Sequence, residues 1–464
     1  MPAEVTSEYV LGQKKVIALH QAYIQSYIRT RTITFSMKME WKVSFVFMIL
    51  AACMIDFSLC HMEPTNTLKS VLPLATSGQN SHSDTIYGIM FDAGSTGTRI
   101  HIYRFKQRAR GSHLELEGEV FESIKPGLSA FADQPKKGAA TVRLLLDLAQ
   151  KEVPSTQWSH TPVVLKATAG LRLLPETQSD ALLSEVREVF RESPFLVPEN
   201  SVSIINGADE GIFAWITVNF LTGRLHSHRT VGILDLGGGS TQITFLPLTK
   251  NTLDQTPHDF LASVELFNST YRLYTHSYLG LGLKLARLAV LGVSEDNDQQ
   301  KQFFHSNCFL HGVKGEWSFA GVTLKYEKKS DGQSGFDACY SEILPIIQDK
   351  LHQVPEMQHS PFYAFSYYYD RAADANLIDH MHGGVLQVYD FAKSAKEVCE
   401  RTEQSPTHSH FLCMDLTFIT ALLKEGFGFE DNTSLQLTKK MYDVEMSWTL
   451  GAIFHVLQSL HQQK

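Results

Sequence analysis

Two segments of the sequence place an aspartate beside a turn rich in glycine and hydroxyl residues. FDAGSTGTRI contains Asp92, and LDLGGGSTQI contains Asp235 at the equivalent position. Glycine allows the backbone of such a turn to approach a ligand closely, and successive N–H groups in the turn form a concavity that binds anions. The pair predicts that one phosphate is held from two sides. The alternative is two plain β-turns in which glycine and serine serve only the geometry.

Each of these aspartates stands where an apolar strand meets its turn, a costly place for a bare carboxylate. A divalent cation would offset the charge. Mg²⁺ keeps several waters and is commonly held by one or two carboxylates together with substrate phosphates, and Ca²⁺ could take its place. The alternative is that Asp92 and Asp235 only cap their own turns.

Further polar residues occur in two segments between the aspartates. KATAGLR offers Thr168 and Arg172 after a short apolar strand, and Glu210 lies at the start of a helix in GADEGIFAWITVN. The helix dipole favours a carboxylate at that end, so Glu210 can face a bound phosphate and act as the general base toward an attacking water. A helix-terminal charge without chemistry is the alternative.

One segment, PFYAFSYYYDRA (361–372), concentrates six aromatic residues. Flat aromatic faces can stack a nucleobase, although such clusters more often belong to a core. Within this segment we expect Tyr367 to contact a nucleotide.

The apolar pattern predicts the elements that position these groups. Apolar strands flank the turns in 86–105 and 231–245, so each aspartate lies in a β-hairpin. Helices are predicted at 139–148 and 183–190, and a short buried strand at 162–167. The repeated strand, aspartate, glycine turn and strand indicate an internal duplication. We therefore expect an α/β chain of two similar lobes whose hairpins face each other across a cleft.

Length and composition agree with a folded globular protein of this size. The chain has 464 residues, of which 43% are hydrophobic and 19% charged, with 41 Lys and Arg against 49 Asp and Glu and a net charge of −8. These values argue against a disordered chain, a collagen-like repeat and a polytopic membrane protein. The chain is mildly acidic, so its composition shows no excess of basic residues of the kind that binds nucleic acid.

The N-terminal region predicts targeting rather than fold. The segment 43–55 is the most apolar window of the chain and follows two lysines, as in a secretory signal peptide. We expect an unstructured extension at 1–36, the signal peptide at 37–60 and a linker at 61–83. An uncleaved anchor is the alternative, but a spanning helix needs about 20 apolar residues.

Cleavage of the signal peptide would leave four cysteines, which allow three pairings. An oxidising lumen supports local closures, so we expect the pairs Cys308–Cys339 and Cys399–Cys413 rather than buried free thiols. Two Asn-x-Ser/Thr triplets, at Asn268 and Asn432, are candidate surface glycan sites on the same route.

Five motifs in order resemble those of the nucleoside triphosphate diphosphohydrolases, the apyrase family. They are DAGSTGTR (92–99), KATAGLR (166–172), GADEGIFAWITVN (207–219), DLGGGSTQITF (235–245) and FYAFSYYYD (362–370). The resemblance covers about residues 84–464 and is closest to the soluble nucleoside diphosphatases of the endoplasmic reticulum. It implies a two-lobed, actin-like fold of the ribonuclease-H type (the ASKHA class), with lobe I at 84–206 and 431–464 and lobe II at 207–430.

The resemblance also implies roles for individual residues. Glu210 would be the general base, and Ser240 and Gln242 would position the attacking water. Asp92, Asp235 and Thr168 would hold a hydrated Mg²⁺ or Ca²⁺, largely through its waters. The remaining implied contacts to phosphate or nucleotide are Gly94, Ser95, Thr96, Gly97, Thr98, Arg99, Gly237, Gly238, Gly239, Thr241 and Tyr367.

The implied reaction is hydrolysis of UDP and GDP, and also of IDP, to the monophosphate and phosphate by direct attack of water. A monomer in the endoplasmic reticulum lumen or secreted is expected, with no nucleic-acid partner and no stable membrane span after signal cleavage. There it would support glycoprotein folding and reglucosylation. Alternatives are a broader nucleoside tri- and diphosphatase of the same family, an actin-like sugar kinase, and a nucleotide-binding protein without catalysis.

Overall fold

The computed structural model describes residues 84–107, 114–225, 229–266, 269–293, 303–330, 333–401 and 409–462. The predicted extension, signal peptide and linker, and the candidate glycan site Asn268, lie outside these ranges. None of the helices within them combines the length and the apolar character that a membrane span requires.

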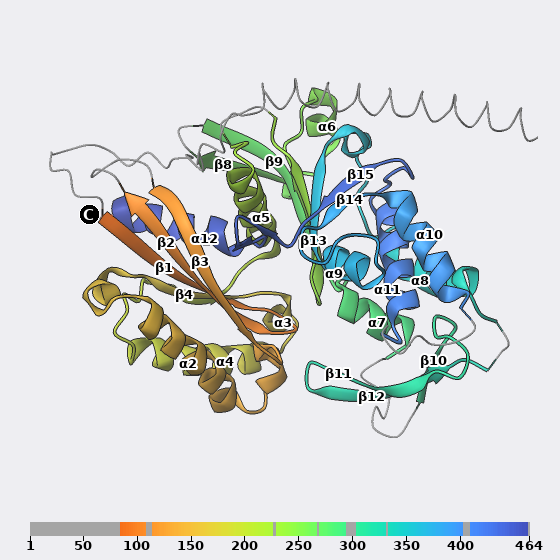
Figure 1. Cartoon of the computed structure of the whole chain (residues 1–464), viewed down its shortest axis with the longest axis horizontal. Helices are drawn as coiled ribbons and strands as arrows, with labels where there is room; N and C mark the ends of the chain where they lie inside the picture. Colours follow the sequence, from red (N-terminus) through yellow and green to blue (C-terminus); the bar gives the residue numbers. More distant parts are fainter. Residues whose placement is uncertain are drawn as a thin grey trace, which may run out of the picture. The chain divides into compact units, whose positions relative to one another are not determined.

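The first sheet is built on the first predicted hairpin. Its strands, in spatial order, are β3 (Leu114–Ile124), β2 (Thr98–Gln107), β1 (Asp84–Ala93), β4 (Val163–Ala167) and β5 (Val202–Ile204). The first three are antiparallel, and β4 and β5 join in parallel. Side chains of β1 alternate between two faces: Ile89 and Phe91 pack with α2 (Pro135–Glu152) and α4 (Glu176–Arg191), whereas Met90 belongs to the core on the other face. Figure 1 shows α2 and α4 together on one side of this sheet.

The second sheet repeats this plan. Its strands, in spatial order, are β14 (Gly384–Gln387), β15 (Ser434–Leu437), β13 (Phe362–Ser366), β6 (Gly232–Leu236), β7 (Ser240–Phe245), β9 (Ser269–Leu279) and β8 (Leu261–Leu266). The antiparallel run β6-β7-β9 corresponds to β1-β2-β3, and the parallel strands β13 and β15 correspond to β4 and β5.

The strand registers make the duplication explicit. Asp92 is paired with Arg99 on the neighbouring strand of the first hairpin, and Asp235 is paired with Gln242 in the second. Both aspartates therefore occupy the same place in the two halves. The predicted α/β fold with duplicated hairpins is confirmed.

Two helices at equivalent positions link the halves. α5 (Gly207–Leu221) follows β5, and α12 (Thr449–Gln462) comes after β15 near the end of the chain. They lie side by side in Figure 1, with the rings of Phe220 and Phe454 4.6 Å apart. Gly451 permits this approach, because a Cβ atom there would lie 2.3 Å from the backbone oxygen of Phe213.

The predicted lobe boundaries remain a prediction, but strand pairing differs from them at one point. β15 lies within 431–464, which was assigned to lobe I, yet it pairs with β13 and β14 of the second sheet. The reason is the duplication itself: β15 is the counterpart of β5, which precedes the linking helix in the first half.

The rest of the second half is largely helical and carries both disulfides. Its helices are α6 (Lys250–Gln255), α7 (Leu283–Val290), α8 (Phe336–Ile347), α9 (Tyr367–Asp374), α10 (Val388–Cys399) and α11 (Leu412–Ala421), and its small sheet consists of β10 (Phe303–Ser306), β12 (Val322–Lys328) and β11 (Lys314–Phe319). The predicted pairs Cys308–Cys339 and Cys399–Cys413 are both disulfides.

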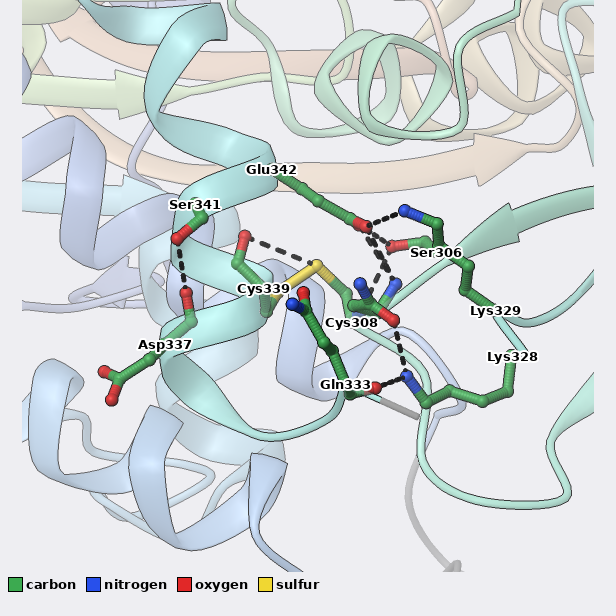
Figure 2. A network of polar contacts seen from close by, with 10 residues as sticks. Ser306, Cys308, Lys328, Lys329, Gln333, Asp337, Cys339, Ser341 and Glu342 are labelled. Atoms are coloured by element: carbon green, nitrogen blue, oxygen red, sulfur yellow. Dashed lines mark hydrogen bonds and ion pairs between the residues drawn. A yellow bond between two sulfur atoms is a disulfide. The ribbon is translucent and has the colours of Figure 1, made fainter. Parts of the chain in front are cut away.

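Polar contacts reinforce the first disulfide, which joins the segment after β10 to α8. The Glu342 carboxylate accepts hydrogen bonds from the Ser306 hydroxyl at 2.6 Å and from the backbone N–H of Asn307 (Figure 2). The disulfide and the carboxylate together hold the base of the small sheet against α8.

Candidate active site

The two glycine turns face each other. Each is closed by a backbone hydrogen bond of 3.0 Å, from the Gly94 N–H to the Gly97 oxygen and from the Gly237 N–H to the Ser240 oxygen. A Cβ atom at Gly238 would lie only 2.5 Å from the Ser95 hydroxyl oxygen, so the second turn meets the first. Glycine is required there because any side chain would collide with the opposite loop.

A cavity of about 430 Å³ lies between the turns and is lined from both halves. The predicted site residues on its wall are Asp92, Gly94, Ser95, Thr96, Arg99, Thr168, Glu210, Asp235, Gly237, Gly238 and Tyr367. Residues from distant parts of the sequence thus converge on one space that can hold a phosphorylated ligand.

The other predicted residues do not line this cavity. They are Gly97, Thr98, Gly239, Ser240, Thr241 and Gln242. Successive side chains of a strand point to opposite faces, so Thr98 and its neighbour Arg99 cannot both reach the cavity. The Thr241 hydroxyl donates instead to the backbone oxygen of Asp235 at 2.8 Å, which supports the strand that carries this aspartate.

The two aspartates offer unpaired carboxylate oxygens. Oδ1 of Asp92 and Oδ1 of Asp235 are buried without a hydrogen-bond partner, whereas Oδ2 of Asp92 accepts from Arg99 at 2.7 Å. Burial raises the pKa of Asp235 to about 6. Orphaned carboxylate oxygens in a buried place fit a hard cation that keeps several of its waters. Thr168, at the end of β4, adds a hydroxyl on the same wall.

Among the described residues no group of three or more His, Cys, Asp or Glu side chains converges as a metal site. The predicted ligands Asp92, Asp235 and Thr168 all lie on the wall of the cavity.

Glu210 lies in the first turn of α5, whose N-terminus is capped by Asn206. Its carboxylate is 7% exposed and forms an ion pair with Arg172. Burial raises the pKa of Glu210 to about 8, the Arg172 guanidinium opposes this shift, and the charges of Asp235 and Asp92 add to it. Burial thus disfavours the ionised form of Glu210, the only form that can accept a proton from water.

A chain of polar contacts connects Glu210 with Ser240 and Gln242. The Gln242 side-chain amide donates to the hydroxyls of Ser240 and Ser277, both at 2.8 Å. Arg172, which pairs with Glu210, approaches the Ser277 hydroxyl at 3.5 Å. Ser240 and Gln242 do not line the cavity, but this chain of contacts connects them with Glu210 through Ser277 and Arg172.

Several cavity residues escaped the sequence analysis, notably Lys284 on α7, Arg371 on α9 and Ser366. Ser366 has φ 56°, a strained conformation for a residue with a side chain, at the junction of β13 and α9. A residue-by-residue alignment of the two halves would have drawn attention to this junction, because Tyr367 follows β13 as Thr168 follows β4. No local pattern marks Lys284 or Arg371.

Comparisons with known proteins agree with this geometry. Residues 78–464 match the model of the GDA1/CD39 (nucleoside phosphatase) family. The chain is 61% identical to ectonucleoside triphosphate diphosphohydrolase 5 of Gallus gallus, covering 87% of this chain and 94% of that protein. It is 56% identical to the nucleoside diphosphate phosphatase ENTPD5 of Homo sapiens, covering 91% and 99%.

The fold also matches a solved structure. A nucleoside triphosphate hydrolase structure from Neospora caninum superposes with a TM-score of 0.58 at 15% identity, covering 82% of this chain and 94% of that one. The two-lobed actin-like architecture expected from the sequence is thereby confirmed. The chain belongs to the GDA1/CD39 (nucleoside phosphatase) family.

Proposed function

We propose that this protein is a nucleoside diphosphatase that hydrolyses UDP, GDP and IDP to the nucleoside monophosphate and phosphate. The observation that carries the proposal is the meeting of the two glycine turns over one cavity that also contains Glu210 and two aspartates with unpaired oxygens. The name of the human relative, a nucleoside diphosphate phosphatase, supports the diphosphate as substrate.

In this proposal the backbone N–H groups of the two turns hold the terminal phosphate. Turns of this kind stabilise the charge that develops on phosphoryl oxygens in the transition state. The hydroxyls of Ser95 and Thr96 and the Arg99 guanidinium add donors from the first half. The residues at 97–98, 239 and 241 keep the turns in shape, because they lie off the cavity wall.

Asp92, Asp235 and Thr168 would hold a divalent cation, Mg²⁺ or Ca²⁺, with water and phosphate oxygens as its other ligands. When bound, such an ion offsets the negative charge of the phosphates and orients them for displacement. Its charge would also oppose the repulsion that Asp92 and Asp235 exert on the ionised form of Glu210.

Glu210 would take the proton from the attacking water. Arg172 orients its carboxylate, and the Ser240–Gln242–Ser277 contacts hold the groups around it in place. Attack on the terminal phosphorus opposite the bridging oxygen then breaks the bond to the nucleoside monophosphate, without a phosphoenzyme.

A substrate panel tests the proposed function. Purified protein is incubated with UDP, GDP, IDP, CDP, UTP and ATP plus Mg²⁺ or Ca²⁺, and phosphate release is measured without any sugar acceptor. We expect kcat/KM for diphosphates to be at least about tenfold higher than for triphosphates, a ratio that a single favourable contact can supply. Equal or better cleavage of triphosphates would favour the broader tri- and diphosphatase. Phosphate release only with a sugar present would identify a kinase-like enzyme.

The compartment is part of the same proposal. We infer that the protein works in the lumen of the endoplasmic reticulum or after secretion, where it would remove UDP and support glycoprotein reglucosylation. Both disulfides suit an oxidising compartment, and Asn432 is exposed in a turn where a glycan could be attached.

Gly282→Ala tests whether the shape of the second turn is needed. The first turn of α7 braces this glycine turn: the N–H groups of Leu283 and Lys284 donate to the oxygens of Gly237 and Gly238, both at 2.9 Å. A Cβ atom at Gly282 would lie 2.4 Å from the Gly239 nitrogen, so the turn must shift. We expect kcat/KM for UDP to fall about 100-fold, as small misplacements of catalytic groups do.

Gly118→Ala is the matched control, because nothing lies within 4 Å of a Cβ atom at Gly118. Circular dichroism should show both variants folded. Unchanged kcat/KM in Gly282→Ala would mean that the second turn does not position the substrate.

A further inference from the structure

Lys284 enters the cavity from the segment that braces the second glycine turn. It is the second residue of α7, and its own N–H group donates to the oxygen of Gly238. A Cβ atom on Gly238 would lie 3.4 Å from Lys284 Cγ, so the side chain runs alongside the turn. The placement of this ammonium group is therefore tied to the backbone that faces the phosphate.

The surroundings of the ammonium group are aromatic. Nζ lies 5.0 Å from the ring centre of Tyr367 and 5.9 Å from that of Trp317. Within the part of the chain that the structure describes, no hydrogen bond or ion pair joins this ammonium to another residue. A half-buried ammonium group that contacts only the faces of aromatic rings is a favourable binding position for an anion.

Two neighbouring cations, Arg287 and Arg371, in contrast, already have carboxylate partners. Arg287 forms a two-pronged pair with the fully buried Asp415, and Arg371 contacts Asp415 at 3.2 Å and Asp374 at 2.7 Å. Lys284 thus provides positive charge on this wall of the cavity that neither Asp415 nor Asp374 neutralises. Burial lowers the pKa of Lys284 to about 7; the positive charge of Arg287 adds to this shift, and the charge of Asp415 opposes it.

Lys284 and Glu210 lie at different places on the wall of the same cavity. Nζ of Lys284 lies 5.0 Å from the ring centre of Tyr367, the residue expected to contact the nucleotide, whereas Glu210 pairs with Arg172 at the start of α5. In an in-line displacement the attacking water and the leaving oxygen lie on opposite sides of the phosphorus. Because Glu210 accepts the proton of the attacking water, the leaving monophosphate must lie on the opposite side of the phosphorus.

We propose that Lys284 binds the phosphate of the departing nucleoside monophosphate, on the side of the scissile bond opposite Glu210. This inference rests on the proposed diphosphatase function and deepens it. The water oxygen bonds to the terminal phosphorus and its proton passes to Glu210. The bond from phosphorus to the bridging oxygen breaks, and that oxygen leaves with the electron pair as part of the monophosphate. The negative charge of the bound nucleotide favours the ammonium form of Lys284, which offsets the charge that this oxygen gains.

The test compares Lys284→Met with wild type and with Lys284→Arg, which keeps the charge. We expect Lys284→Met to lower kcat/KM for UDP about 100-fold, the usual effect of removing one donor to a developing oxyanion. Lys284→Arg should recover part of this loss. Lys284→Gln provides a second neutral variant in case the methionine impairs folding.

Product inhibition locates the phosphate that Lys284 binds. In Lys284→Met the inhibition constant of UMP should rise about tenfold, because one charge-assisted hydrogen bond is lost. The inhibition constant of inorganic phosphate should stay within about twofold, since the glycine turns that bind it are intact. Equal weakening of both inhibitors would overturn the proposal, because Lys284 would then bind the terminal phosphate. Wild-type kcat/KM in the neutral variants would overturn it as well.

Lys396→Met is the matched control. Lys396 also lies over an aromatic ring, 5.4 Å from the centre of Phe336, but on α10 and away from the cavity wall. It should behave as wild type in both assays. The wild-type protein is assayed with UDP first: no cleavage there would contradict the proposed function itself, whereas cleavage that is insensitive to Lys284 contradicts only this inference.

Discussion

Glu210→Gln is expected to lower kcat for UDP hydrolysis by about 10³-fold, within the range that general-base catalysis contributes. Glutamine has the same shape and can still contact Arg172, but it cannot take a proton from water. Nucleotide binding should therefore persist, since the glycine turns and Lys284 are unchanged. Phosphate release gives kcat, and equilibrium binding of UDP by calorimetry gives the affinity.

Asp209→Asn is the matched control for this substitution. Asp209 is the adjacent acidic residue on α5, contacts Asn206 and does not line the cavity. It should retain activity within about threefold, as expected for a surface substitution away from the reacting groups. Near-normal turnover in Glu210→Gln would remove Glu210 from the role of base.

The same assignment predicts how activity depends on pH. Burial raises the pKa of Glu210 to about 8, so the carboxyl is protonated and inactive as a base below that pH. Activity should rise with pH toward this value. An increase in cation concentration from subsaturating to saturating should move the rising limb to lower pH, because positive charge near Asp92 and Asp235 favours the ionised carboxylate. A profile that is flat between pH 6 and 9 would contradict the assignment.

Removal of divalent cations is the second change with a large expected effect. Chelation should reduce phosphate release to background, and Mg²⁺ or Ca²⁺ should restore it. Asp235→Asn should lower kcat/KM at least about 100-fold, because charge stabilisation by a bound metal contributes several kcal/mol. It should also raise the cation concentration needed for half-maximal activity.

Thermal unfolding separates this role from a structural one. The pKa of Asp235 is raised to about 6 by burial, so its ionised form is disfavoured in the folded state at neutral pH. Asp235→Asn removes that cost, and in cation-free buffer its Tm should equal or exceed that of wild type. Asp180→Asn, on the exposed face of α4, is the control and should match wild type in both assays. Full activity of Asp235→Asn at low cation concentration would rule out Asp235 as a ligand.

Local sequence patterns were sufficient for the two hairpins and for the aspartates in them. Strand, aspartate, glycine turn and strand are contiguous, and hydrogen bonds between neighbouring strands form within each segment. The repeat then implied the duplicated fold, since each copy of the motif forms the same hairpin in one of two similar sheets. Glu210 was likewise identified from its place at the start of a contiguous apolar helix.

The direction of individual side chains does not follow from the sequence pattern. Thr98 and Thr241 are in the predicted turns, yet neither lines the cavity. The role of Ser240 and Gln242 beside the attacking water stays a prediction; in the structure the Gln242 amide donates to the hydroxyls of Ser240 and Ser277. β15 follows the predicted boundary at 430/431 but pairs with the second sheet, a membership that only strand pairing reveals.

The sequence by itself determined the class of fold, the paired phosphate turns and the acidic residues near them, because each follows from a short contiguous pattern. Only the tertiary structure decided which groups meet around the cavity. These contacts are the ion pair of Arg172 with Glu210, the hydrogen bond of Gln242 to Ser277, and the position of Lys284 between Tyr367 and the second turn. These residues lie far apart along the chain, and their contacts arise from the docking of two halves around α5 and α12, which no local periodicity encodes.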